Sequence, residues 1–418
     1  MSSFYKTVDL TPGRAKVAER DSILSACCGT IGEVTFTDSA IIILYAGMLG
    51  ASDMFSLITT AVMPLFNGIF IIPMAFFAYL MIVAAPFFGD AAVGLMIAML
   101  ILFAVSHTGY VAGWFPLLDT FLLGERRSTY LSKMRFCWQS ITTVFILLAG
   151  LCIGGNPSLW HLQLLLLIAA IISIGSILFI ARIPVFKTER QEASQLREGL
   201  SLAVSNKAMV GYSAYLFVLN LAAYGTIPMA TLYLKKYLNA PDNIIVIISS
   251  AALGGMLLGS FCAGKIIKSF GLKNTFLGIH VTYALTNILI FLIGKNTMSS
   301  DCTYVAIAVL LLVYSFTFAN ANIASTTEMM ALARPGNKVM AMAFCGTFFY
   351  GGSGLSRLVT SLVLGSGILA PEWHIGNITF CHYQTIFLIY SVAIVFVAML
   401  LVVVPAIFPK GEYEYGIE

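Results

Sequence analysis

Residues 162–181 read LQLLLLIAAIISIGSILFIA, an uncharged run that decides the fold class of this chain. A helix rises about 1.5 Å per residue, so these twenty positions span roughly 30 Å, the thickness of the hydrocarbon core of a bilayer. Uncharged runs of similar length recur at residues 304–323 and 385–408. Helices satisfy their own backbone hydrogen bonds in lipid. We therefore expect an all-α polytopic membrane protein.

The composition of the 418-residue chain supports a membrane environment. Hydrophobic residues make up 59% and charged residues only 10%, and the mean hydropathy is +0.92. A typical globular domain is about half apolar, so this chain exceeds what a soluble core buries. The net charge of +4 comes without a basic tract interleaved with aromatics. We expect the lipid bilayer as partner and no nucleic acid.

Apolar runs and their breaks place nine spans outside one difficult region. They lie near Ser22–Gly50, Trp138–Ile153, Leu159–Ala181, Met209–Tyr233, Ile244–Ala263, Thr275–Leu292, Tyr304–Glu328, Val339–Leu364 and Gln384–Phe408. The difficult region runs from Asp53 to Leu123, with breaks at Pro73, Pro86 and Gly89. It holds two long spans or three tight ones. The N-terminus lacks the pattern of a cleaved signal peptide, so we expect the first span to remain.

Loop charge decides between these counts, because Lys and Arg concentrate in cytoplasmic loops. Basic residues gather at the N-terminus and in the segments 125–135, 182–207, 264–273 and 334–338, and Lys235 and Lys236 are the exception. An even number of spans must separate the N-terminus from segment 125–135, which requires three spans in the difficult region. The expectation is about twelve transmembrane helices with both termini cytoplasmic, in the plasma (inner) membrane.

Residues 182–207 form the longest polar stretch inside the chain and divide the spans into two equal sets. We therefore expect an N-terminal six-helix bundle over residues 1–181, a cytoplasmic linker over 182–207, and a C-terminal six-helix bundle over 208–418. Two equal sets of spans suggest an internal repeat whose halves rock about a central site.

Two local patterns resemble the major facilitator superfamily of secondary transporters. Residues 264–273 read GKIIKSFGLK and are similar to the loop motif of that family, with Lys268 in place of its acid. Residues 114–119 (WFPLLD) and 125–132 (ERRSTYLS) resemble the segment joining the fourth and fifth spans of many bacterial members. The loop motif expected between spans two and three is missing. The resemblance implies two pseudo-symmetric six-helix bundles around a central cavity lined by spans one, four, seven and ten.

Two carboxylates lie in the first span. An ionisable group inside a membrane costs free energy, so it is a candidate functional residue by default. Glu33 shares a helical face with Thr30 and Thr37, whereas Asp38 is turned by about 140° from it. Removal from water would favour the protonated form of Asp38. We expect Glu33 or Asp38 to couple transport to protons, and the alternative is a carboxylate held in a network between helices.

Arg357 lies in a run of small residues, 351–356, within the eleventh span. A permanently charged guanidinium at that depth requires an acid, backbone carbonyls or an anionic substrate. As a substrate clamp it favours a carboxylate or phosphate. Pairing with an acid of the first or second span, or extension to the outer interface, are the alternatives.

Amides and aromatic residues populate the spans that the resemblance assigns to the cavity. Amides donate and accept hydrogen bonds and rings stack on apolar faces, which suits a neutral polyol or an amphipathic organic solute. Such residues also link helices, which is the alternative. The candidate substrate residues are Tyr110, Trp114, Asn220, Tyr224, Asn320 and Asn322.

The remaining motifs exclude other classes of protein. The eight cysteines show no zinc or redox spacing, although Cys302 and Cys381 fall in loops on one side and could form a disulfide. No Walker-type sequence exists and Glu33, Asp38 and His107 form no catalytic spacing, so we expect neither cofactor, metal nor enzyme. The expected function is a monomeric secondary active transporter of a small organic solute, working by alternating access as a proton symporter. Export of amphipathic or drug-like compounds is the alternative, and an intramembrane enzyme is disfavoured.

Overall fold

The protein is predominantly α-helical. The structure is a computed structural model that describes residues 7–37, 40–52, 54–55, 72–119, 121–122, 124–186, 196–295, 297–333, 338–376 and 378–403. Its helices are α1 (Pro12–Phe36), α2 (Ile41–Met48), α4 (Ile72–Ala84), α5 (Ala92–Asp119), α6 (Gly124–Ile153), α7 (Leu159–Ala181), α8 (Leu196–Ser205), α9 (Lys207–Ala223), α10 (Thr226–Leu232), α11 (Asp242–Phe270), α12 (Leu272–Leu292), α13 (Ser300–Leu332), α14 (Lys338–Gly365) and α15 (His382–Val403).

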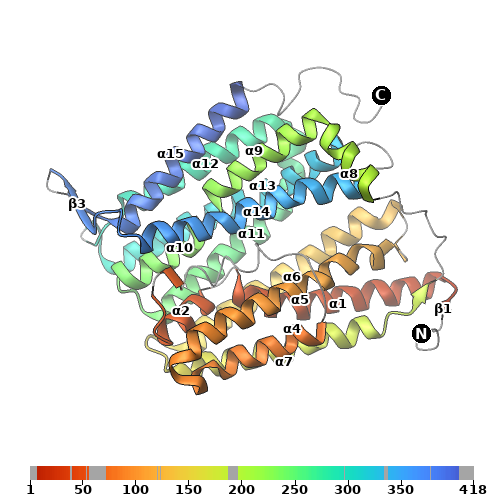
Figure 1. Cartoon of the computed structure of the whole chain (residues 1–418), viewed down its shortest axis with the longest axis horizontal. Helices are drawn as coiled ribbons and strands as arrows, with labels where there is room; N and C mark the ends of the chain where they lie inside the picture. Colours follow the sequence, from red (N-terminus) through yellow and green to blue (C-terminus); the bar gives the residue numbers. More distant parts are fainter. Residues whose placement is uncertain are drawn as a thin grey trace.

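Short elements connect the helices. The turns η1 (Ala85–Ala91) and η2 (Tyr233–Tyr237) follow α4 and α10. Strand β1 (Thr7–Val8) pairs in parallel with β2 (Val185–Phe186), and β3 (Glu372–Ile375) pairs antiparallel with β4 (Ile378–Cys381). The β3–β4 hairpin projects from one end of the molecule, called the hairpin end (Figure 1). The opposite end, where α7 stops and α8 begins, is called the linker end.

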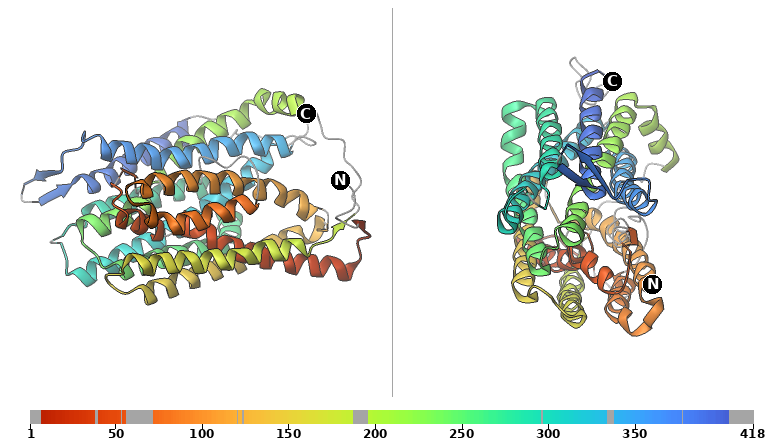
Figure 2. Two further views of the ribbon diagram at one scale, coloured as in Figure 1. Left: turned by 60° about the horizontal axis from the view of Figure 1, so that its bottom comes forward. Right: turned by 90° about the vertical axis from the view of Figure 1, so that its left-hand side faces the viewer.

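The long helices run along the long axis of the molecule (Figure 1). Helices α1–α7 gather on one side and α8–α15 on the other (Figures 1 and 2). Across this division, α6 packs against α11 and α2 touches α10. These two groups of helices are called the N-terminal half and the C-terminal half below.

The protein is an integral, multi-pass membrane protein. Within the described ranges, eight helical stretches are long and apolar enough to cross a membrane, and the bent pair α1 and α2 would make a ninth. α7 shows the lipid-facing pattern directly, because Ile171 and Leu178 on its surface are more than half exposed. Large apolar side chains exposed along a whole helix face are stable against lipid rather than water.

The predicted spans outside the difficult region overlap observed helices, although Ser22–Gly50 covers both α1 and α2, and residues 404–408 of the last span lie outside the described part of the chain. Inside the difficult region, α4 and α5 form a packed pair joined by η1, where Gly89 takes a φ of 54° that favours glycine. One of the eight apolar stretches, Phe76–Ser106, runs across this turn. Residues 56–71 lie outside the described part of the chain, so the third span there and the total of twelve stay predictions.

One expectation about a loop was wrong. The basic segment 125–135 was assigned to a loop, but α6 begins at Gly124 and contains all of it. Arg135 therefore lies eleven residues inside a helix, which is roughly 16 Å from its start.

Small residues allow close approach of helices. Gly255 and Gly259 of α11 lie against the backbone of α13, where an added Cβ would come within 2.2 Å of the carbonyl oxygens of Leu312 and Phe316. In the N-terminal half, the Ser25 hydroxyl of α1 donates to the Ser176 carbonyl of α7 at 2.8 Å. Spacing of small residues by four is a common device for packing helices in lipid.

All eight cysteines are free thiols, including the pair predicted as a candidate disulfide. Cys302 is exposed in the first turn of α13, whereas Cys381 is buried at the end of β4. Burial raises the pKa of the Cys381 thiol to about 11, so it stays protonated at neutral pH.

Candidate functional site

The first long helix of each half is interrupted, with a sharp bend only in the N-terminal half, because Lys207–Tyr237 in the C-terminal half counts as one continuous stretch. α1 ends at Phe36 and α2 starts at Ile41 with a bend of 44° between them. α9 ends at Ala223 and α10 starts at Thr226. Interrupted helices at corresponding positions of two repeats are the best structural pointer to a central binding site.

Side chains from the C-terminal half bond the carbonyls that these breaks release. Arg357 of α14 donates through Nη1 to the Thr37 carbonyl, the last turn of α1, at 3.4 Å. Tyr314 of α13 donates to the Ala223 carbonyl, the last residue of α9, at 2.6 Å. Non-helical backbone inside a bilayer is stable only when neighbouring groups satisfy it in this way.

The two breaks meet at Ser356 and Arg357 of α14. A Cβ added at Gly225, in the second break, would lie 3.2 Å from the Ser356 hydroxyl and 1.9 Å from the Tyr390 hydroxyl. Arg357, the next residue, contacts the first break. The Ser356 hydroxyl is buried and has no hydrogen-bond partner among the described residues. One turn of α14 therefore touches both broken helices, and this place is called the junction.

A polar face of α14 points at the N-terminal half. Tyr350, Arg357, Ser361 and Gly365 are spaced by seven, four and four residues, which places them on one side of a helix. The Ser361 hydroxyl donates to the Met54 carbonyl at 2.5 Å. A Cβ at Gly365 would lie 3.2 Å from the Met54 Cβ. α14 is also absent from the eight apolar stretches, as expected for a helix that lines a polar path.

The hairpin end of this interface is closed. Ser361 and Arg357 are buried, at 0% and 3% exposed. The neighbouring contact of α6 with α11 is equally close there, because a Cβ at Gly150 would lie 3.0 Å from the Ile247 nitrogen. The Asp242 N–H also donates to the Gly155 carbonyl across the two halves at 2.9 Å.

Tyr350 and Arg135 lie toward the linker end of the same interface. Tyr350 of α14 is 46% exposed, and Arg135 of α6 is exposed as well. Exposed side chains of both halves thus lie in this part of the molecule.

The predicted proton and clamp residues lie in α1 and α14. Glu33 is half-buried in α1, and its carbonyl accepts from the Thr37 hydroxyl at 2.6 Å. Arg357 is buried at the junction. Asp38 lies outside the described residues, and so do the side chains of Tyr110 and Trp114 in α5.

The amides of the C-terminal half bond within that half. The Asn220 amide donates to the Phe349 carbonyl at 3.1 Å, and the Asn320 amide donates to Phe316 in its own helix at 2.8 Å. The Tyr224 hydroxyl donates to the Asn322 side chain at 3.2 Å. The structure thus brings Tyr224 and Asn322 together, while Asn220 and Asn320 are buried against backbone. Their role as substrate ligands stays a prediction.

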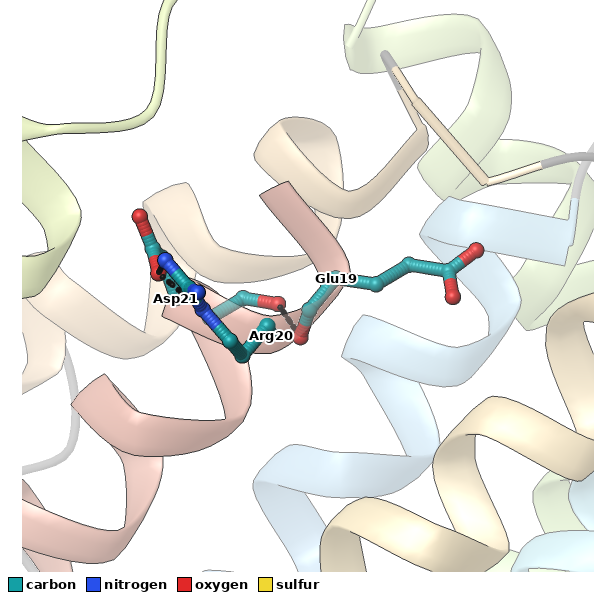
Figure 3. Close-up of polar contacts among 4 residues, drawn as sticks. Glu19, Arg20 and Asp21 are labelled. Atoms are coloured by element: carbon teal, nitrogen blue, oxygen red, sulfur yellow. Dashed lines mark hydrogen bonds and ion pairs between the residues drawn. The ribbon is translucent and has the colours of Figure 1, made fainter. Parts of the chain in front are cut away.

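Sequence reasoning missed three groups. Arg135 and Ser356 carried no visible signal, because one lay in an apparent loop and the other in a run of small residues. Asp21 fell just outside the predicted first span, yet it is 2% exposed in α1. The Arg20 guanidinium pairs with it at 2.9 Å, whereas Glu19 points to the other side of the helix (Figure 3). The pair explains how a carboxylate is tolerated there, and nothing links it to the junction.

The ionisable residues offer no metal site within the described ranges. No three His, Cys, Asp or Glu residues of that part of the chain could hold a metal ion. His280 is buried, with one ring nitrogen 2.6 Å from the Phe276 carbonyl and the other 3.3 Å from the Tyr215 hydroxyl. Both ring nitrogens of His280 thus have partners within the protein, and the residue serves the packing of the helices.

No protein-family model and no curated sequence matches the chain. Solved structures do match it, and they identify the fold. A point mutant of the nucleoside transporter NupG is 17% identical with a TM-score of 0.61, over 94% of this chain and 100% of NupG. A bacterial homologue of the iron transporter ferroportin, in an inward-facing state, is 11% identical with a TM-score of 0.59, over 93% and 98%. A bacterial metal transporter is 12% identical with a TM-score of 0.56, over 94% and 99%.

The chain shares the fold of these solved membrane transporters. The resemblance predicted from the motifs is confirmed at the level of fold. This transporter fold accounts for broken helices and buried polar groups in a chain that is otherwise so apolar. The identities are low, and the three proteins are named for nucleosides in one case and for metals in the others, so the likeness establishes the fold and not the cargo.

Proposed function

We propose that the protein is a secondary active transporter that moves a small organic solute together with protons by alternating access. Twelve helices would form two six-helix bundles, residues 1–181 and 208–418, that rock about the junction, with residues 182–207 as a cytoplasmic linker. The meeting of both broken helices at Ser356 and Arg357 is the observation that carries the proposal. A site touched by both halves senses their relative movement.

Glu33 and Asp38 are the proposed proton-coupling residues. Arg357 bonds the carbonyl of Thr37, the residue before Asp38, and consecutive Cα atoms are only about 3.8 Å apart. Pairing of an ionised Asp38 with the guanidinium is the part of the proposal that links the two residues. Protonation would weaken such a pair and release Arg357, which links proton binding to movement of α14.

The proposed solute path runs along the polar face of α14. Arg357 would contact the solute at the junction, with Tyr224 and Asn322 as the neighbouring polar pair. Asn220, Asn320, Tyr110 and Trp114 complete the predicted lining. The linker end would face the cytoplasm of the plasma (inner) membrane, because Arg182 and the basic segment 264–273 lie at that end.

Counterflow in proteoliposomes tests the proposal once a thermal-shift screen has found a solute that raises the stability of the purified protein. Liposomes loaded with unlabelled solute should take up labelled solute transiently, because a carrier exchanges one for the other. The matched control is Arg357→Gln, which should reconstitute and fail to exchange. Conversion of the labelled solute into a new species, or leakage unaffected by Arg357→Gln, would contradict the proposal.

A further inference from the structure

We infer that the protein has a second binding site at the hairpin end, in a cavity between the two halves that takes a small neutral molecule with hydroxyl or amide groups. The site is separate from the junction, and its existence does not depend on the proposed transport. It also gives a role to Lys235, one of the two lysines that the loop-charge pattern left as an exception.

The cavity itself is the first argument. It has a volume of about 400 Å³ and is called the end cavity, and small-molecule sites in proteins have volumes of about 300–1,000 Å³. Both halves line it, through Gly155, Asn156, Lys235, Asn239, Ala240 and Pro241. Except for Lys235, these residues lie between the stretches that are apolar enough to span a membrane. The end cavity therefore lies at the membrane surface and not against lipid tails.

The two halves are in contact beside the end cavity. The Asp242 N–H donates to the Gly155 carbonyl at 2.9 Å, and a Cβ added at Gly155 would lie 3.6 Å from the Pro241 Cβ. Separation of the halves at this end would therefore take the cavity apart. A molecule bound to both walls favours the state in which the hairpin end is closed.

The second argument is a set of amide groups without partners. Asn156, from the N-terminal half, and Asn239, from the C-terminal half, are exposed, and within the described part of the chain their side chains form no hydrogen bond. The Asn243 Oδ1 is buried without a hydrogen-bond partner, and a Cβ added at Gly155 would lie 3.7 Å from it. Amides donate and accept hydrogen bonds, so the three groups match the hydroxyl and amide groups of a small molecule.

The third argument is charge, which selects a neutral ligand. The Lys235 ammonium pairs with the Asp242 carboxylate, which is 2% exposed. An anion that took Lys235 for itself would leave a buried carboxylate without its partner, which costs free energy. A cation would have to displace Lys235 from that carboxylate. The ammonium carries three donors, so it can keep Asp242 and still donate to a neutral hydroxyl or carbonyl oxygen.

Two matched pairs of sugars test the inference by thermal unfolding of the purified full chain. The neutral sugars are glucose and N-acetylglucosamine, and their charged partners are glucuronate and glucosamine. At least one neutral sugar should raise the melting temperature more than its charged partner, because a ligand stabilises the native state that binds it. General stabilisation by sugars acts on both members of a pair and cancels in the difference. No difference within either pair would overturn the inference.

Variants of the two exposed amides test where the sugar binds. Asn156→Ala and Asn239→Gly should each remove the difference between the neutral sugar and its charged partner. Glycine is chosen at position 239 because Asn239 has a φ of 52°, which glycine adopts without strain. Asn274→Ala, which removes an exposed amide at the linker end, is the control and should keep the difference. A difference that persists in both cavity variants would refute binding in the end cavity.

A second measurement tests whether the bound sugar joins the two halves. Ser361 is 0% exposed, so the rate at which Ser361→Cys reacts with a water-soluble maleimide reports how often the hairpin end opens. The stabilising sugar should slow this reaction about elevenfold at ten times its dissociation constant, while the exposed Cys302 reacts at an unchanged rate. An unchanged rate at Ser361→Cys would overturn the inference. A thiol at position 361 that never reacts, with or without sugar, would contradict the transport proposal alone, because the unfolding measurement does not require this end to open.

Discussion

At the scale of single residues, the buried Arg357 is best understood through the backbone it bonds. Its guanidinium reaches from α14 to the Thr37 carbonyl, where α1 has stopped and no longer supplies an internal donor. The residue before it, Ser356, touches the break between α9 and α10. One cation thus stabilises an interrupted helix of the opposite half, a role that a sequence pattern alone does not reveal.

Replacement of Arg357 by Lys should damage this arrangement while conserving the charge. A lysine ammonium lacks the planar fork, so we expect a loss of stability of about 1–2 kcal/mol and a clear loss of transport. Thermal unfolding and uptake by the same preparation measure both effects. Arg182→Lys, at an exposed position, should change neither, and wild-type transport by Arg357→Lys would show that the guanidinium geometry is unimportant.

The two carboxylates of the first broken helix should control the pH dependence of uptake. Asp38→Asn and Glu33→Gln each remove a proton-binding group at nearly constant size. If either carries the coupling proton, its variant should lose the response of uptake to pH, and uptake should no longer concentrate the solute. Uptake measured from pH 5 to pH 8 checks this, and an unchanged profile in both variants would remove proton coupling through these residues.

Some residues of the candidate site could be predicted from the sequence, and others could not. Arg357 and Glu33 stand out because charges are rare in apolar runs. Arg135 did not, because its neighbours Arg126, Arg127 and Lys133 make the segment resemble a loop. The bonds of Asn220 and Asn320 go to carbonyl oxygens, which every residue carries, so no sequence pattern could have distinguished a structural amide from a ligand.

At the scale of elements, the contact of α11 with α13 depends on two glycines spaced by four residues. Gly255 and Gly259 bring the helices so close that an added methyl group would meet the α13 backbone at 2.2 Å. Backbone cannot move aside as a flexible side chain does, so the helices themselves would have to separate.

Gly259→Ala should therefore destabilise the protein by about 1–3 kcal/mol, as overpacking of a close contact does. Gly264→Ala is the matched control in the same helix, because nothing lies within 4 Å of the added atom there. It should be neutral or stabilising by about 0.5–1 kcal/mol, since alanine favours helix over glycine. Thermal unfolding of both variants measures the difference, and equal melting temperatures would refute the close contact.

The positions of the helices could be predicted from the sequence, whereas the breaks within them could be predicted only in part. Runs of about twenty apolar residues fix where a span lies, since hydrocarbon excludes charge over a fixed thickness. Gly225 gave a local signal for the second break. The first break, after Phe36, has neither glycine nor proline, and it is contacted by α14 through residues more than 300 positions apart.

At the scale of the whole molecule, the two halves are in close contact at the hairpin end, and exposed polar side chains lie toward the linker end. Met54 contacts Ser361 and Gly365 at the closed end, whereas Tyr350 and Arg135 are exposed toward the other end. A transporter that works by alternating access must open the first contact to reach its other state.

A disulfide across the closed end should arrest transport. The Cβ atoms of Met54→Cys and Gly365→Cys would lie about 3.2 Å apart, close to the usual span of roughly 3.5–4.5 Å for a disulfide. Oxidation of the double variant should abolish uptake, and reduction should restore it. The two single variants are the controls. Full uptake by the cross-linked protein would show that transport does not require this end to open.

The most direct test of the account is a pair of distances between spin labels in the purified protein. One pair, at Asn156 and Asn239, spans the two halves at the hairpin end, and the other, at Lys133 and Lys268, spans them at the linker end. All four positions are exposed. The account predicts two populations at each end that shift in opposite directions as the pH changes, one end lengthening while the other shortens. A single, pH-independent distance at both ends would contradict it.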